Sequence, residues 1–543
     1  MPLLRTSSKT FPASKGVMSD IPYVLRIEFG ELARETTKIV GKPIACHKCN
    51  GFLISTDQIR DDPKVGRHFL CPFCGTLNVI EGEVVAAGDE TDFVIELPPE
   101  ATKTAIGEVS AGGRSFLALI DVSGSMAGEN LSAVKRSLTT SIDSLAVNAP
   151  DTMFGLIEFE STVVARDLET GHPVELPTSS FMSLKDIDEA TKNLLDKIRL
   201  VHVGKNADKL KNHVRALRDQ GGTALGPAVA MASTISKHRN VGRVVLLTDG
   251  LANEGIGALE GYQVTPGSKF YENIGRRFLD LGTAVDVVGI ASGGGMELKT
   301  LGLMPEITGG TMYYVTPNEL DRSLSELAGS AMLGRDVEVK LVTPAGVKVK
   351  DASGASRVVL DELKKKSGGK IGVVGEDHEL YFEVEPSAKI NDQEIPIQVQ
   401  VAYTDNDGAR RVRAVTTRLR VSDKEEEIMK SLDPTVGATF VTQKAGEDAV
   451  RGDREKGKKR LSAFRSAMKA RARAAPAPVQ QMLEKADNVL AAEEEELVRQ
   501  EERMREAPAG GAAPSAAADM SAVENLAQMK RSSKKIFEDE DKA

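Results

Sequence analysis

Short, unbroken runs of Val, Ile and Leu alternate with segments of helical spacing between residues 113 and 333. Examples of the apolar runs are SFLALIDVS (115–123), RVVLLTDG (243–250) and AVDVVGIA (284–291). Strands that are buried on both faces have this pattern, and parallel neighbours need helices as crossovers. The pattern predicts an α/β fold with a doubly wound, mostly parallel sheet. In such a sheet, ligands bind at the carboxyl ends of the strands.

The remaining regions have different patterns. Apolar and polar positions alternate along residues 335–422, as in LYFEVEP and EIPIQVQVAYTD, which predicts antiparallel strands and a small β-sandwich. Residues 423–504 form a charged helical region, in which a basic helix and an acidic helix flank the proline break AAPAP. Residues 505–543 are rich in Ala, Gly, Pro and Ser, and are expected to be a flexible tail with a short docking helix near its end. Residues 1–40 have a mixed pattern and are interpreted as a lead-in.

Composition restricts the class of protein. The chain has 543 residues, 41% hydrophobic and 27% charged, which fits about three or four globular domains rather than a disordered or collagen-like chain. No apolar run approaches the roughly 18 residues of a transmembrane helix, and the first residues lack the apolar core of a secretory signal. A cytoplasmic location is therefore expected.

The net charge of −9 and an aromatic content of 4% argue against a nucleic-acid-binding protein. The basic helix at 454–473 is the exception to the acidic balance. The simpler interpretation is that it pairs with the acidic helix that follows. The alternative is contact with an acidic surface, such as that of a membrane.

All four cysteines fall within residues 41–86, in two CxxC pairs separated by 21 residues. Each CxxC loop brings two thiolates to one metal ion, and two such loops complete a tetrahedral Zn²⁺ site. A closed four-thiolate site has no open position for water, so the zinc is expected to be structural rather than catalytic. The spacing thus predicts a zinc ribbon. Its ligands are Cys46, Cys49, Cys71 and Cys74.

A second metal site is predicted at the rim of the α/β sheet. The first strand ends in a DxSxS turn, the segment GGT lies far along the chain, and the strand RVVLLTDG ends in Thr-Asp-Gly. These segments offer carboxylate and hydroxyl oxygens, which suit Mg²⁺ or Mn²⁺. The candidate ligands are Asp121, Ser123, Ser125, Thr223 and Asp249.

The segments SFLALIDVSGSM, GGTALGPAV and VVLLTDG together resemble the von Willebrand factor A (vWA) family with its metal-ion-dependent adhesion site. The resemblance covers about residues 113–333 and implies the five ligand roles just named. It also implies that a Glu or Asp from a partner protein completes the Mg²⁺ coordination. One departure is the long insertion between Ser125 and Thr223, which adds helical material beside the rim.

The order of zinc ribbon, vWA domain, β-sandwich and helices is similar to that of the inner-coat subunits of the COPII vesicle coat. The primary hypothesis is a non-enzymatic intracellular adaptor or scaffold, whose vWA domain binds an acidic partner residue through Mg²⁺. One alternative is a structural component of a large assembly, such as a vesicle coat or a cytoskeletal complex. Another is a subunit that presents substrates to an ATPase or protease.

Overall fold

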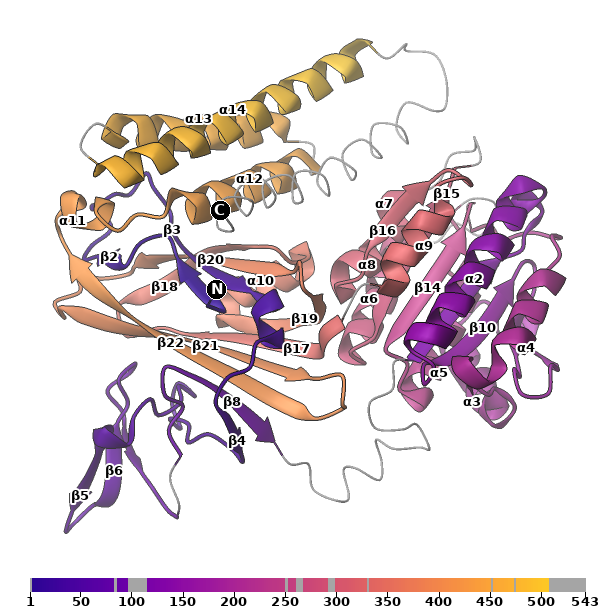
Figure 1. Cartoon of the computed structure of the whole chain (residues 1–543), viewed down its shortest axis with the longest axis horizontal. Coiled ribbons are helices and arrows are strands. Elements are labelled where there is room, and N and C mark those ends of the chain that lie inside the picture. The colour runs from indigo at the N-terminus through magenta and orange to yellow at the C-terminus, as the bar shows by residue number, and fades with distance from the viewer. Residues whose placement is uncertain are drawn as a thin grey trace.

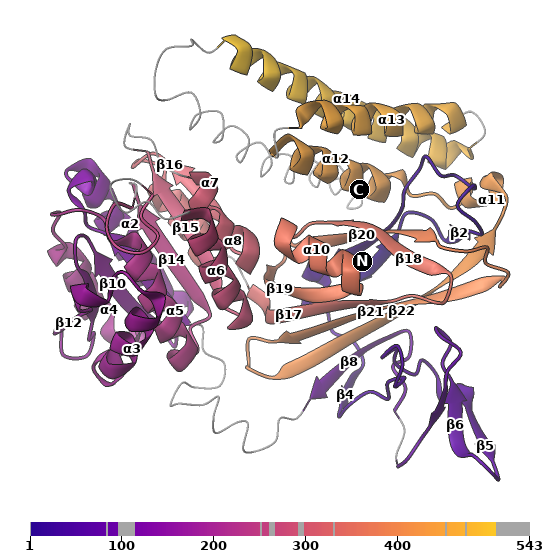
Figure 2. The same cartoon turned by 180° about the vertical axis from the view of Figure 1, so that it is seen from behind.

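The computed structural model describes residues 2–82, 85–95, 115–249, 252–259, 267–291, 298–329, 332–450, 453–472 and 475–506. These residues form an α/β domain, a β-sandwich covered by helices on one side, and a small cysteine-bearing sheet (Figure 1). The view from behind in Figure 2 shows the α/β domain beside one end of the sandwich. Among the described helices, none has the length and apolarity needed to cross a bilayer.

The α/β domain contains the doubly wound, mostly parallel sheet that its sequence pattern predicts. The strand order is β12-β11-β10-β9-β14-β15-β16, and β9 pairs in parallel with both β10 and β14. The order therefore reverses between β9 and β14, where α/β sheets bind ligands. The strands are β9 (Ser115–Asp121), β10 (Met153–Phe159), β11 (Val163–Arg166), β12 (Pro173–Glu175), β13 (Val201–His202), β14 (Arg243–Thr248), β15 (Ala284–Ile290) and β16 (Met312–Val315).

Helices cover both faces of this sheet because alternate residues of its central strands are apolar and point to opposite faces. Leu117 and Leu119 of β9 belong to one buried cluster, and Ala118 and Ile120 belong to the other. The helical elements are η3 (Gly124–Met126), α2 (Glu129–Asn148), η4 (Thr178–Ser180), α3 (Leu184–Leu194), η5 (Leu195–Lys197), α4 (Val203–Ala216), α5 (Leu225–Arg239), α6 (Gly267–Asp280), α7 (Leu298–Leu301), α8 (Leu303–Thr308) and α9 (Leu320–Gly329). The insertion before Thr223 supplies α3, which packs on α5, and α4, which packs on α2.

The β-sandwich uses more of the chain than residues 335–422. Residues 1–40, interpreted from the sequence as a lead-in, contribute strands to both of its sheets. Two of these strands pair with strands that lie more than 300 residues later in the chain. The smaller sheet has the order β1 (Leu4–Thr6), β3 (Tyr23–Glu28), β20 (Glu379–Pro386) and β18 (Val347–Ser353). The larger has the order β19 (Gly368–Gly375), β17 (Met332–Val342), β21 (Glu394–Thr404), β22 (Arg410–Ser422), β8 (Glu90–Ile95) and β4 (Lys38–Val40), with β2 (Thr10–Pro12) pairing β22.

Two further features of the sandwich depart from the alternating pattern. The segment expected to contain strands only also holds helix α10 (Arg357–Lys366), whose buried residues Val359, Leu360 and Leu363 lie at helical spacing. The α/β domain is an insertion between β8 and β17, which belong to the same sheet. The short η1 (Phe29–Ala33) packs against β17 and β19.

The α/β domain meets the sandwich through a backbone contact. Gly309 ends α8 with a φ of +77°, and Gly372 lies in β19 with a φ of +90°. A Cβ on Gly309 would overlap the Val373 carbonyl, and a Cβ on Gly372 would overlap the Thr308 carbonyl. Leu279 and Ile307 of the α/β domain join the apolar core of the sandwich. The two parts are thus packed directly on each other.

In the described part of the chain, helices follow the sandwich, and the second of them packs against β3 and β18 of the smaller sheet. They are α11 (Glu425–Met429), α12 (Pro434–Val450), α13 (Arg454–Ala472) and α14 (Ala477–Glu506). The basic α13 pairs with the acidic α14: Arg465 lies 2.8 Å from Asp487 and 2.6 Å from Glu494. This favours the simpler interpretation of the basic helix. The tail predicted for residues 505–543, with its docking helix, lies outside the described residues from residue 507 onward.

Candidate functional site

The cysteine-bearing sheet consists of β5 (Ile59–Asp62), β6 (Gly66–Leu70) and β7 (Leu77–Val79), preceded by η2 (Thr56–Gln58). Two similar turns carry the cysteines. In one, the Cys46 carbonyl accepts a 2.8 Å hydrogen bond from Asn50 N, and in the other the Cys71 carbonyl accepts one of the same length from Gly75 N. Asn50 and Gly75 both have positive φ, so the first turn uses an asparagine where the second uses a glycine.

Gly51, which follows the first turn, has a different role from Gly75. It lacks a positive φ, but a Cβ at this position would overlap the Phe73 ring. The glycine lets the first turn approach the second, which brings the two cysteine pairs together.

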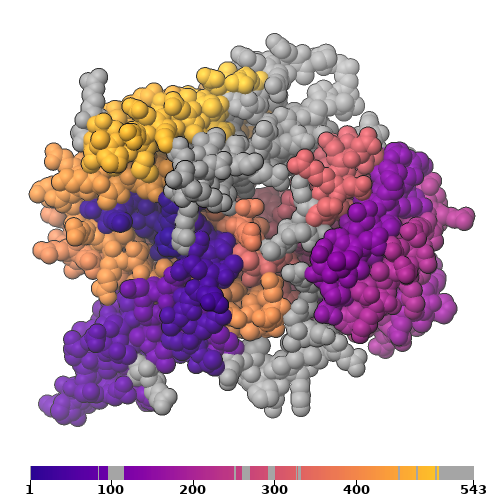
Figure 3. Space-filling model, viewed as in Figure 1, coloured from indigo at the N-terminus to yellow at the C-terminus, as the bar shows by residue number. Residues whose placement is uncertain are grey.

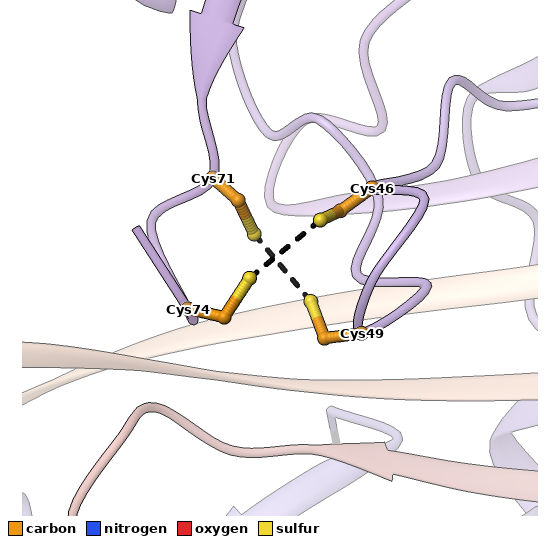
Figure 4. Close-up of side chains that lie close together, drawn as sticks. All are labelled: Cys46, Cys49, Cys71 and Cys74. Atoms are coloured by element: carbon orange, nitrogen blue, oxygen red, sulfur yellow. Dashed lines mark hydrogen bonds between the residues drawn. The ribbon is translucent and has the colours of Figure 1, made fainter. Parts of the chain in front are cut away.

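The four cysteines converge on one point (Figure 4). Their Sγ atoms all lie within 4.8 Å of one another, with Cys46–Cys74 at 3.6 Å and Cys49–Cys71 at 3.5 Å. Sulfurs at about 2.3 Å from a tetrahedral Zn²⁺ are separated by about 3.8 Å, so the cluster fits the ion. The two predicted pairs therefore form a zinc-ribbon-like site whose ligands suit a structural Zn²⁺.

The surroundings of Cys46 favour a thiolate, whereas burial raises the pKa of Cys49 and of Cys71. Burial acts to raise the pKa of Cys46, but the N–H groups of Cys49 and Lys48 stabilise the thiolate and hold this pKa below its usual value. Asn78 Nδ2 lies 3.5 Å from Cys46 Sγ, and Asn78 Oδ1 lies 2.8 Å from His47 Nδ1. Asn78 had no signal in the spacing of the cysteines. It orients the first turn from strand β7.

The cysteine cluster is seated on the sandwich. Buried Gln398 of β21 accepts a 2.8 Å hydrogen bond from Phe52 N through its Oε1, and Gln400 donates one of 2.8 Å to the Asn50 carbonyl. Val342 packs into the apolar cluster around the cysteines. These contacts attach the ribbon to the larger sheet of the sandwich.

At the rim of the α/β sheet, four of the five predicted Mg²⁺ ligands form a connected group. Asp121 Oδ1 accepts a 2.9 Å hydrogen bond from Ser123 N, and the hydroxyls of Ser123 and Ser125 lie 3.0 Å apart. Ser125 Oγ then donates a 2.8 Å hydrogen bond to Asp249 Oδ1. Segments that end β9 and β14 are thereby joined, as the topology predicts.

The fifth predicted ligand, Thr223, reaches this rim through its backbone. Gly124 N, in the turn after β9, donates a 3.1 Å hydrogen bond to the Gly221 carbonyl, two residues before Thr223. Among the described residues, the Thr223 hydroxyl has no hydrogen-bond partner. The structure therefore places the GGT segment beside the DxSxS turn without linking its hydroxyl to the other four side chains.

Most of the candidate ligands at the rim are buried, but part of the DxSxS turn is open to solvent. Asp121, Ser123, Thr223 and Asp249 are each at most 4% exposed, whereas Gly124 and Ser125 are exposed. Burial raises the pKa of Asp121 to about 6, and the nearby carboxylate of Asp249 acts in the same direction. Two carboxylates held in a buried site favour a divalent cation, because its charge offsets theirs.

Two residues that sequence reasoning missed support the acidic groups. Asn130, in the first turn of α2, donates a 2.9 Å hydrogen bond to Asp249 Oδ2. Thr248 donates to Asp121 Oδ2. Thr248 directly precedes Asp249 in the RVVLLTDG strand, so its position could have indicated a role at the rim. Asn130 gave no such indication, because polar residues are common at the start of any helix.

Comparison with known proteins agrees with this architecture. Residues 114–328 match the family model of the Sec23/Sec24 trunk domain. The "Circularly permutated Ras protein 1" of Dictyostelium discoideum is 25% identical over 464 residues, covering 78% of this chain and 54% of that protein. The "Protein transport protein SEC24" of Kluyveromyces lactis is 20% identical over 455 residues, covering 75% of this chain and 46% of that protein. The chain thus spans about half the length of these curated relatives.

Among solved structures, the human COPII-coat protein Sec24c is similar to this chain with a TM-score of 0.69 and 16% sequence identity. The similarity covers 90% of this chain and 71% of Sec24c, so it extends well beyond the α/β domain. Residues 114–328 therefore match a Sec23/Sec24 trunk domain, within a chain that shares the fold of Sec24.

Proposed function

We propose that the chain is a protein-interaction scaffold whose trunk-like domain holds a Mg²⁺ ion and binds an acidic side chain of a partner protein through it. Asp121, Ser123, Ser125, Thr223 and Asp249 are the proposed ligands. The observation that carries the proposal is the hydrogen-bonded contact between the DxSxS turn and Asp249, which brings oxygen donors from distant segments to one rim.

The chemistry of the donors supports this choice of ion and partner. Hydroxyl and carboxylate oxygens suit Mg²⁺ or Mn²⁺, and Mg²⁺ usually keeps some coordination positions for water or another ligand. Ser125 and Gly124 are exposed, so an incoming carboxylate has access from the solvent side. If Asp249 acts through a bridging water, only one protein carboxylate contacts the Mg²⁺ directly, and the cation would still attract an anionic ligand.

The test is affinity purification of binding partners with the full chain, in buffer with Mg²⁺ and in buffer depleted of Mg²⁺ by dialysis. A strong chelator is avoided because it would also remove zinc from the four cysteines. We expect partners that are retained only with Mg²⁺ and lost with the Asp121→Ala and Ser125→Ala variants. Ser125→Ala is the more specific of the two variants, because the Ser125 side chain is exposed and its removal leaves the buried contacts of Asp121 intact. Equal retention in both buffers and by both variants would reject the mechanism.

A second candidate is a structural role in a large coat-type assembly. It is favoured by the similarity to Sec24c across 90% of this chain and by the relatives named as protein transport proteins. The match of residues 114–328 to the Sec23/Sec24 trunk domain also supports this candidate, in which the chain has no enzymatic role. Incorporation into a periodic polymer at fixed stoichiometry, with no dependence on Mg²⁺, would favour this candidate over the first.

In either case we propose that the ribbon binds Zn²⁺ for stability alone. The four sulfurs would complete the coordination of the ion, and the cluster lies against the sandwich rather than at the trunk rim. The zinc and magnesium sites would therefore act independently.

A further inference from the structure

The loop that carries Thr223 is fixed by hydrogen bonds on three sides. It joins α4 to α5 and lies between the turn after β9, the turn after β10 and the loop after β14. On the first side, Gln220 N donates a 2.8 Å hydrogen bond to the Val122 carbonyl, and the Gly221 carbonyl accepts one of 3.1 Å from Gly124 N. These two bonds set the distance between the loop and the DxSxS turn.

On the second side lies Ser161, in the turn after β10. Its hydroxyl accepts a 2.7 Å hydrogen bond from Gly222 N and donates one of 2.8 Å to Glu254 Oε1. The carbonyl of the preceding Glu160 accepts a 2.7 Å hydrogen bond from Ala224 N. Ser161 therefore links the Thr223 loop to the loop after β14.

On the third side, Asn253 pairs with Thr223 through both backbone groups of the threonine. Asn253 Oδ1 accepts a 2.8 Å hydrogen bond from Thr223 N, and Asn253 N donates one of 3.1 Å to the Thr223 carbonyl. Asn253 is itself held because its loop lies on α5: a Cβ on Gly226 would overlap the Ile256 carbonyl. The peptide groups of Thr223 are thus fixed, while its side chain has no hydrogen bond within the described part of the chain.

The two glycines of the GGT segment make this arrangement possible. A Cβ on Gly221, whose φ is +68°, would overlap the Glu160 carboxylate, and a Cβ on Gly222 would overlap that of Glu254. The glycines thus make room for the side chains that hold the loop. They do not form a phosphate-binding loop, because the N–H groups of Gly222, Thr223 and Ala224 are all bonded within the protein.

The hydrogen-bond pattern of the loop distinguishes between a cation and an anion as its ligand. An anion needs free N–H groups, and those of the three successive residues are taken. The Thr223 hydroxyl has no partner among the described residues, so its oxygen is available to a cation. We infer that Ser161 and Asn253 are positioning residues that fix the loop so that the Thr223 hydroxyl becomes a ligand of the proposed Mg²⁺. This inference rests on the proposed function.

The experiment is a double-mutant cycle on the full chain, with Mg²⁺ itself as the probe. Affinity is measured by isothermal titration calorimetry and, separately, by the rise in unfolding temperature on adding Mg²⁺. We expect Thr223→Val and Ser161→Ala each to weaken Mg²⁺ binding about tenfold. The double variant is expected to bind no more weakly than Thr223→Val alone, because Ser161 acts only through Thr223. Asn253→Ala is expected to behave as Ser161→Ala does.

Two further variants separate positioning from general stability. Ser161→Thr keeps the hydroxyl and is expected to restore wild-type Mg²⁺ affinity, and Ser462→Ala, on an exposed position of α13, is expected to change nothing. Additive losses in the cycle, or a Ser161→Ala variant with unchanged affinity, would overturn the inference while leaving the proposed site in place. A wild-type chain that binds no Mg²⁺ would instead overturn the proposed function. If Ser161→Ala lowers the unfolding temperature of the Mg²⁺-free chain, the same double-mutant cycle is measured by calorimetry with Asn253→Ala in place of Ser161→Ala. Additive losses in that cycle would overturn the inference.

Discussion

The Ser125 hydroxyl and the Asp249 carboxylate are 124 positions apart in sequence and share a 2.8 Å hydrogen bond. The contact lies where the strand order of the sheet reverses, between β9 and β14. Asn130 bonds the second oxygen of the same carboxylate, so Asp249 is oriented from two directions. Its position is therefore set by the fold before any cation binds, which lowers the cost of binding one.

Magnesium is expected to stabilise the chain. A ligand present at about 100 times its Kd adds about 2.7 kcal/mol to the free energy of unfolding, because it binds the folded state only. Thermal unfolding of the zinc-containing chain is measured with MgCl₂ and with NaCl of equal ionic strength. We expect a rise with MgCl₂ that the Ser125→Ala variant lacks. A rise of the same size in this variant would contradict the assignment of Ser125.

Loss of one cysteine is expected to release the zinc. In Cys74→Ser, the remaining three sulfurs leave the tetrahedron incomplete, and structural zinc sites contribute folding free energy directly. We expect less than one equivalent of bound zinc by atomic absorption and faster proteolysis between residues 41 and 86. His68→Ala, which changes a half-buried residue on β6, should keep its zinc. Full zinc content in Cys74→Ser would show that the cluster is not the binding site.

The contact between the trunk-like domain and the sandwich can be tested with two glycines of equal φ. Gly372 and Gly346 both have a φ of +90°, but only Gly372 lies against a backbone carbonyl, that of Thr308. Alanine at either site costs about 1–2 kcal/mol for its backbone conformation. We expect Gly372→Ala to lose a further 1–3 kcal/mol, the usual cost of overpacking. Urea denaturation gives both values, and equal losses would argue against a tight contact between the two parts.

Acid is expected to weaken the attachment of α12 to the sandwich. Burial acts to raise the pKa of Asp351, but hydrogen bonding to Lys364 and the charge of Lys444 outweigh it and hold this pKa below its usual value. Because this pKa is lower in the folded state than in the unfolded state, the charged Asp351 stabilises the fold at pH values above its usual pKa of about 3.9. That stabilisation is lost as the pH falls through the lowered pKa. Between about pH 5 and pH 2 we expect the unfolding temperature of wild type to fall more steeply than that of Asp351→Asn. Parallel curves would exclude this role for Asp351.

The α/β domain was predictable because its strands are buried on both faces, so each reads as an apolar run such as Phe116 to Ile120. The N-terminal strands were not, because their partners lie far away: Leu25 of β3 pairs with Phe382 of β20. A short strand alone carries too little pattern to show which sheet it joins. Helix α10 was missed because its ten residues lie between strands and have only one apolar face.

The candidate sites divide in the same way. The cysteine pairs and the DxSxS turn were visible because their ligands lie close together in sequence, as Cys46 and Cys49 do. The groups that orient the ligands come from other elements, as Asn130 and Asn253 show. Their role depends on hydrogen bonds that only the folded chain defines.

The trunk-like domain enters and leaves the sandwich from one sheet, through β8 and β17, and Figures 1 and 3 show it lying at one side of that sheet. In the antiparallel order β17-β21-β22-β8, the end of β8 and the start of β17 lie at the same edge. The contact of Gly309 and Gly372 also packs this domain directly on the sandwich. A pull exerted on the rim of the domain would therefore be transmitted to the sandwich through that packed contact, and the two parts would respond as one unit.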